Sequence, residues 1–167
     1  MPFFVYLFIL FELLPVSFID LKTKKISNVW PVLNILTYFF LVFFFKDNYP
    51  FVLEHFLYPL CCLGVGFLFF IIKIMGPGDS KFLSSLFLLV PTEFQMTFFL
   101  VLLYSTILVG SILLLLHTIR NFDKIKSAVL FREYGQLRGI FGSKFTYAPL
   151  ILFTWVVFGW NIRIFSI

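Results

Sequence analysis

The chain alternates between long apolar runs and short polar connections. Six runs stand out, and most have the continuous hydrophobicity typical of a helix in lipid. They are Pro2–Ile19, Val29–Phe45, Phe56–Ile74, Phe82–Val90, Phe94–Leu116 and Tyr147–Trp160. The pattern therefore predicts a bundle of about six transmembrane helices joined mostly by short loops.

The fourth run differs from the others because about nine apolar residues are too few to cross a bilayer alone. We expect Phe82–Val90 to belong either to a longer helix that continues through Pro91 and Glu93 or to a re-entrant element. The longest polar segment, His117–Phe145, follows the fifth run. Its middle, roughly Asp123–Leu137, mixes basic and apolar residues at helical spacing, which predicts a helix in the membrane interface.

Composition supports the same class of protein. The 167 residues are 61% hydrophobic and 13% charged, with 27 phenylalanines, whereas ordinary soluble domains carry about 25% charged residues. We therefore predict an all-α integral membrane protein, with one polytopic domain over residues 1–167. The first run has no basic residues ahead of it and no small-residue cleavage site behind it, so we expect a retained helix rather than a cleaved signal peptide.

The basic residues predict an orientation. The loops after the first, third and fifth runs hold eleven of the thirteen lysines and arginines, and the opposite side keeps only Lys46 and Arg163. The positive-inside rule then places those loops in the cytoplasm and both termini outside the cytoplasmic (inner) membrane. We expect Trp30, Trp155 and Trp160 to anchor run ends at the lipid interface. The net charge of +5 comes without a pattern that favours nucleic acid.

Neither the cysteines nor the histidines predict a metal site. Cys61 and Cys62 are adjacent in an apolar run, and neighbours on a helix point about 100° apart. They lack the four-ligand spacing of a zinc site. His55 and His117 fall on opposite sides of the membrane in this topology. We therefore expect no metal and no other cofactor, which argues against a metalloprotease.

Two aspartates fall on the same side of the membrane in this topology. Asp20 ends the first run and Asp79 precedes the fourth, both on the cytoplasmic side. Two carboxylates in a partly dry site share a proton, because like charges raise the pKa of one of them. One then acts as general base on water and the other donates a proton to a carbonyl. This predicts Asp20 and Asp79 as catalytic residues at the cytoplasmic membrane boundary.

Three residues around Asp79 complete the expected site. Gly76 and Gly78 allow backbone shapes closed to other residues and let another chain segment approach closely, so we assign them to an active-site loop. Lys81 follows at a helix start, where its ammonium would favour a charged carboxylate. It would tune the aspartate pair or hold the loop, or serve only as a positive-inside anchor.

Simpler interpretations remain open for each acidic residue. Asp79 in a Pro-Gly-Asp-Ser turn could cap a helix, and Asp20 could be an ordinary charge at a membrane boundary. Glu12 lies inside the first run, eight residues before Asp20. An ionisable residue at that depth is a candidate for function or for a bond to a neighbouring helix.

These residues resemble the motifs of a known family, the type IV prepilin peptidases. GPGDSK resembles the family's second catalytic motif, Gly-x-Gly-Asp with a lysine two positions later, and DLKTKKISN (Asp20–Asn28) resembles the first. KFTYAPLIL (Lys144–Leu152) resembles the entry to the family's last span. Ser27 stands where the family usually has proline, and Pro77 lies between the two glycines.

The resemblance implies an aspartic endopeptidase that removes the basic leader from prepilins and pseudopilins at the cytoplasmic face of a bacterial or archaeal membrane. Asp20 and Asp79 carry over as its catalytic pair. The chain resembles the compact, peptidase-only members associated with Flp/Tad-type pili, so methyltransferase activity is not expected. The archaeal preflagellin peptidases are also similar.

Two functions of other classes stay open from the sequence alone. One is a small membrane transporter or channel component that uses Asp20 and Asp79 as an ion or proton site. The other is a catalytically idle assembly factor that binds pilin subunits through its helices. The sequence gives neither the oligomeric state nor the exact substrate.

Overall fold

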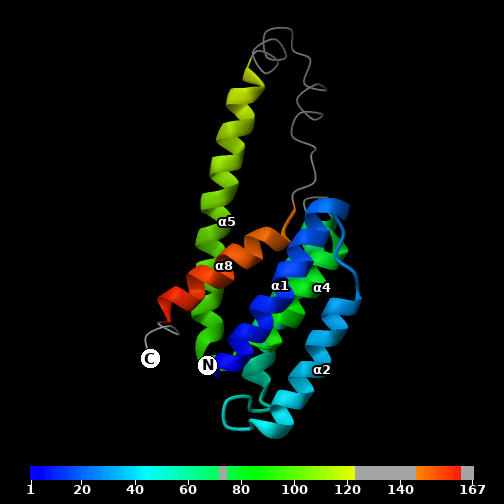
Figure 1. Ribbon diagram of the computed structural model, residues 1–167, viewed down its shortest axis with the longest axis vertical. Coiled ribbons are helices and arrows are strands. Elements are labelled where there is room, and N and C mark those ends of the chain that lie inside the picture. Colours follow the sequence, from blue (N-terminus) through cyan, green and yellow to red (C-terminus); the bar gives the residue numbers. More distant parts are fainter. Residues whose placement is uncertain (72–74, 123–145, 163–167) are drawn as a thin grey trace.

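The computed structural model describes residues 1–71, 75–122 and 146–162, and this part of the chain is helical. Figure 1 shows the arrangement of the helices. Within these residues, six α-helices and one short 3₁₀ helix follow one another. They are α1 (Phe3–Thr23), α2 (Val29–Phe44), η1 (Leu53–Phe56), α3 (Leu57–Ile71), α4 (Pro77–Leu88), α5 (Thr92–Arg120) and α8 (Ala148–Asn161).

Successive helices run in opposite directions, so alternate connections lie at the same end of the bundle (Figure 1). The end of α1 and the start of α4 are therefore neighbours in space. The helix α5 extends beyond the others, because its 29 residues span about 43 Å, more than the hydrocarbon thickness of about 30 Å.

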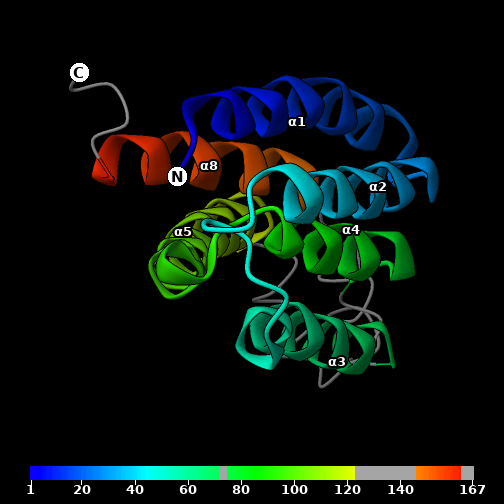
Figure 2. The same cartoon turned by 90° about the horizontal axis from the view of Figure 1, so that it is seen from below.

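The helices pack as two groups, which Figure 2 shows from below. In one group α8 lies between α1 and α5. In the other, α4 lies between α2 and α3. The two helices that carry Asp20 and Asp79, α1 and α4, thus belong to different groups. The distance between the two aspartates therefore depends on the contacts between the two helix groups.

Aromatic side chains join the two groups at the end opposite the aspartates. The rings of Phe87 on α4 and Phe98 on α5 are 4.9 Å apart, and Trp155 on α8 lies 5.2 Å from Phe98. Trp155 also stacks on Tyr6 of α1 and donates its indole N–H to the Tyr6 carbonyl at 3.2 Å. The Gln95 side chain on α5 adds hydrogen bonds to the carbonyls of Phe87, at the end of α4, and Val90, in the turn that follows.

The prediction that Trp155 anchors a span end at the lipid interface is wrong, since its side chain is fully buried. Hydropathy cannot separate a ring that faces lipid from one that faces another helix, because both surroundings are apolar. Trp160 is 81% exposed, as an anchor requires.

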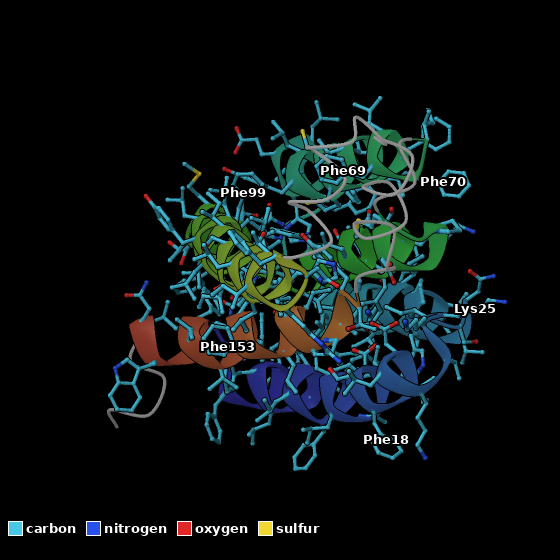
Figure 3. All side chains as sticks on the ribbon, turned by 90° about the horizontal axis from the view of Figure 1, so that it is seen from above. Phe18, Lys25, Phe69, Phe70, Phe99 and Phe153 are labelled. Atoms are coloured by element: carbon cyan, nitrogen blue, oxygen red, sulfur yellow. The ribbon has the colours of Figure 1, made fainter. Side chains whose placement is uncertain are left out.

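The outer surface is apolar, as expected of a protein in lipid. Figure 3 shows Phe18 on α1 and Phe70 on α3 pointing away from the bundle. Within the described residues, α1, the η1–α3 unit and α5 are long and apolar enough to cross a membrane, and α2 and α8 are shorter apolar helices. The expectation of an all-helical protein with several membrane spans is confirmed to that extent.

The fourth apolar run forms a helix of only 12 residues, α4, about 18 Å long. It begins at Pro77 and ends at Leu88, so Gly78 and Lys81, which were expected in a loop, lie within the helix, and Gly76 directly precedes it. The alternative of one helix continuing through Pro91 and Glu93 is wrong, because a turn at Leu89 and Val90 separates α4 from α5. Proline lacks an N–H and favours such a stop. The predicted interfacial helix at Asp123–Leu137 lies outside the described residues.

Candidate active site

Asp20 lies in the last turn of α1 and is 2% exposed. The helix ends just after it, where Lys24 takes a left-handed conformation with φ of 52° and its N–H donates to the Asp20 carbonyl at 2.8 Å. The Asp20 side chain accepts the backbone N–H of Ala148 at 3.1 Å. Because Ala148 is the first residue of α8, its N–H has no partner within that helix and is available to a carboxylate.

Asp79 lies in the first turn of α4 and is 8% exposed. Its carboxylate reaches back to accept the backbone N–H of Gly76 at 3.0 Å. Pro77 takes the first helical position, where its missing N–H costs nothing. Asp79 therefore does cap the helix, as the simpler interpretation held. The same carboxyl is also subject to the charge of Asp20.

The two aspartates interact electrostatically. Burial raises the pKa of Asp79 to about 6, the Gly76 N–H opposes this shift, and the charge of Asp20 adds to it. Asp79 therefore holds a proton more readily near neutral pH than an ordinary aspartate does.

The raised pKa makes stability depend on pH. Folding favours protonated Asp79, so its contribution is fully present below its ordinary pKa of 3.8 and is lost as the pH rises through about 6. Asp79→Asn stays neutral and can still accept the Gly76 N–H. Relative to wild type it should gain up to about 3 kcal/mol between pH 4 and pH 8, since one pKa unit is about 1.4 kcal/mol. Thermal unfolding in detergent at several pH values measures this, and a difference that does not change with pH would contradict it.

Two glycines permit close contacts around Asp79. A Cβ on Gly78 would lie 2.7 Å from the carbonyl oxygen of Ile26, in the loop that follows α1. A Cβ on Gly66 of α3 would lie 2.5 Å from the Cβ of Ser80. Among the described glycines none has a positive φ. The part of the loop prediction that invoked unusual backbone shapes is therefore wrong, and close approach of neighbouring segments is the reason for Gly78.

The other residues singled out from the sequence lie away from the two aspartate carboxyls. Lys81 is exposed on α4, and in the described part of the chain it forms no ion pair with either aspartate. Glu12 is buried within α1, two turns from Asp20. The two histidines lie near opposite ends of the bundle, His55 in η1 and His117 in the last turn of α5.

Tyr147 is a site residue that the sequence did not single out. It immediately precedes α8, and its hydroxyl lies 3.5 Å from that of Thr106 on α5. Burial is the main cause that raises the pKa of Tyr147, and the charge of Asp79 adds to it, so the two groups interact electrostatically. The motif KFTYAPLIL contains this tyrosine, but the resemblance assigns it no role. The sequence feature that could have pointed to Tyr147 is its position directly before a predicted helix that begins with Ala-Pro.

Tyr147 also lines an apolar cavity of about 300 Å³ between α3 and α5, together with Leu83 of α4. Phe69 and Phe99, both labelled in Figure 3, line it from opposite helices. Small residues, Cys62 and Gly66, leave room on the α3 side. The cavity is therefore lined almost entirely by apolar side chains, and Tyr147 is one of its few polar neighbours.

A buried pair of carboxylates that accept backbone N–H groups defines a candidate aspartic protease site within a membrane protein. Comparison with protein families gives the more specific class. Residues 6–115 match the model of the type IV leader peptidase family, so the chain belongs to that family. The match covers both aspartates and most of the bundle, and it ends before Tyr147 and α8.

The resemblance inferred from the two aspartate motifs is thereby confirmed at the level of the family. Membership implies an aspartic-type peptidase and prepilins as the class of substrate. A search of curated proteins found no significant match, and a search of solved structures found none.

Proposed function

We propose that this protein is a membrane-embedded aspartic endopeptidase that removes the basic leader from type IV prepilin or pseudopilin-like precursors at the cytoplasmic face. The observation that carries the proposal is the pairing of Asp20 and Asp79. Both are buried, each accepts one backbone N–H, and the charge of one acts on the other.

The two carboxyls take different roles in the reaction. Asp79, with its raised pKa, donates its proton to the carbonyl oxygen of the scissile peptide bond. Asp20 removes a proton from a water molecule, whose oxygen bonds to the carbonyl carbon. The tetrahedral intermediate then loses its C–N bond as the proton on Asp20 passes to the leaving nitrogen. The intermediate's O–H returns its proton to Asp79, which restores the starting state.

The apolar cavity suits the substrate. A prepilin-like precursor joins a basic leader to a hydrophobic helix, so the bond to be cut lies next to an apolar segment. The cavity between α3 and α5 is apolar, and it is lined in part by Tyr147, which interacts electrostatically with Asp79. It can hold apolar side chains of the substrate while the leader remains on the basic side of the bundle.

The basic residues support the orientation. Lys22, Lys24 and Lys25 are exposed at the end of α1 that carries Asp20. The positive-inside rule places that end in the cytoplasm, with the apolar helices forming one bundle in the inner membrane. No methyltransferase activity is proposed, and Asp20 and Asp79 require no cofactor for the reaction above.

Cleavage of a defined precursor tests the proposal. The purified protein in lipid nanodiscs is mixed with a synthetic precursor that has a basic leader and one hydrophobic helix, and the products are identified by mass spectrometry. We expect release of the intact leader, with no added metal or nucleotide. An intact precursor, together with proton uptake by liposomes that contain the protein, would instead support a transporter that uses the same aspartates.

A further inference from the structure

A buried polar cluster lies below the aspartates, where the two helix groups meet. It consists of Glu12 on α1, Asn34 on α2 and Ser85 on α4, whose side chains are 5%, 0% and 3% exposed. Asn34 donates through Nδ2 to the hydroxyl oxygen of Ser85 at 3.2 Å. The Ser85 hydroxyl in turn donates to the carbonyl of Phe82 at 2.8 Å. Asn34 therefore connects α2 to the helix that carries Asp79.

Glu12 and Asn34 carry buried hydrogen-bonding groups that are not all satisfied. Asn34 lies close enough to interact with the Glu12 carboxyl. Among the described residues, both Glu12 oxygens and Oδ1 of Asn34 are buried without a hydrogen-bond partner. An ionised carboxylate and an amide oxygen both only accept hydrogen bonds. A protonated Glu12 supplies the missing O–H donor, and it also avoids an unpaired charge at membrane depth.

We propose that Glu12 is protonated and donates to Asn34, and that the chain Glu12–Asn34–Ser85 is the positioning device that sets the spacing of Asp20 and Asp79. The proposal rests on the proposed function, because it assigns a purpose to that spacing. All three residues would act through the aspartates and would not touch the substrate.

The location of the chain fits this role. Glu12 lies eight residues before Asp20, about 12 Å along α1, and Ser85 lies six residues after Asp79, about 9 Å along α4. Because α1 and α4 run in opposite directions (Figure 1), both residues fall at a similar depth below the site. The helix α1 packs mainly on α8, and α4 mainly on α2 and α3. A polar link through Asn34 therefore joins two helices that share little direct packing.

Crosslinking measures the spacing without needing catalysis. Asp20→Cys and Asp79→Cys are introduced together, with Cys61→Ala and Cys62→Ala to remove the native thiols, and a short thiol-reactive linker is added. We expect efficient crosslinking in this parent, severalfold slower crosslinking after Asn34→Leu, and an unchanged rate after Glu12→Gln, because glutamine keeps a neutral donor. Tyr38→Phe is the matched control, since Tyr38 is also buried on α2 and its hydroxyl has no hydrogen-bond partner among the residues that the structure describes.

Cleavage provides the second measurement, in protein that keeps both aspartates. Asn34→Leu and Glu12→Leu should lower kcat by roughly 10²-fold, the cost of a small misplacement of reacting groups. KM should change little, because the cavity between α3 and α5 is untouched. Glu12→Gln and Tyr38→Phe should stay near wild type. Wild-type crosslinking and cleavage in Asn34→Leu would overturn the proposal, as would a loss in Glu12→Gln as large as in Glu12→Leu.

Infrared difference spectroscopy decides the protonation state even if a leucine variant fails to fold. Exchange into D₂O should shift a carboxylic-acid C=O band in the wild type that is missing in Glu12→Gln. Absence of that band from the wild type would overturn the proposal. Failure of the parent cysteines to crosslink would count against the aspartate pair itself, and the band would then decide the state of Glu12 alone.

Discussion

Replacing either Asp20 or Asp79 with asparagine should lower the rate of leader removal by roughly 10²- to 10⁴-fold, the usual contribution of general acid–base catalysis. Each substitution keeps the size of the side chain and an oxygen that can accept the Ala148 or Gly76 N–H. What it removes is the capacity to carry a proton. Mass spectrometry of a precursor incubated with each purified variant measures the rate.

The double variant should be no slower than the worse single one, because residues that act as a unit give non-additive losses. Asp47→Asn is the matched control, since Asp47 is exposed in the connection between α2 and η1. This variant should cleave the precursor at the wild-type rate. Substantial cleavage by Asp79→Asn would remove the acid–base assignment. Losses that multiply in the double variant would show that the two carboxyls act independently.

The sequence predicted those features that depend on hydropathy and on order along the chain. The apolar runs located the helices to within a few residues. Their alternation placed Asp20 and Asp79 at the same end, because each crossing reverses direction. Both motifs lie within the segment 6–115 that matches the family. The two aspartates were easy to single out, since a chain with only 13% charged residues offers few acidic candidates.

Features that depend on which residues contact one another in the folded protein could not be predicted from the sequence. The sequence marks Glu12 as unusual at its depth but does not show that Asn34 faces it. Tyr147 lies near Asp79 only because α8 packs between α1 and α5, which is a property of the tertiary arrangement. Lys81 lies only two residues after Asp79, yet on the helix the two side chains point in different directions, and that of Lys81 is exposed. Proximity along the chain was therefore a poor guide to membership of the site.

Gly78→Ala should lower cleavage by roughly 10²-fold, because it moves the two aspartates apart without altering either one. The added methyl group would meet the Ile26 carbonyl oxygen at 2.7 Å. Since a backbone atom cannot rotate away, the loop that follows α1 must shift from α4. The free energy of unfolding should fall by about 1–3 kcal/mol, as for other overpacked sites. Cleavage rates and thermal unfolding of the same preparation measure both effects.

Gly110→Ala is the matched control, because Gly110 lies within α5 and no atom lies within 4 Å of an added Cβ. It should cleave normally and be slightly more stable, as alanine favours a helix over glycine. Wild-type cleavage by Gly78→Ala would show that the Ile26 contact does not set the spacing of the aspartates.

Gly76→Ala separates the two ways in which a glycine can act on this site. Its added Cβ would lie 3.0 Å from Oδ2 of Asp79, and its three nearest atoms all belong to the Asp79 carboxyl. The methyl group therefore disturbs the Asp79 carboxyl itself and leaves the contact between α4 and the Ile26 loop in place. Crosslinking of Asp20→Cys with Asp79→Cys should then slow after Gly78→Ala but not after Gly76→Ala, although both substitutions reduce cleavage. Equal crosslinking in the two variants would mean that α1 and α4 are held together elsewhere, and Glu12 and Asn34 would be the first residues to test.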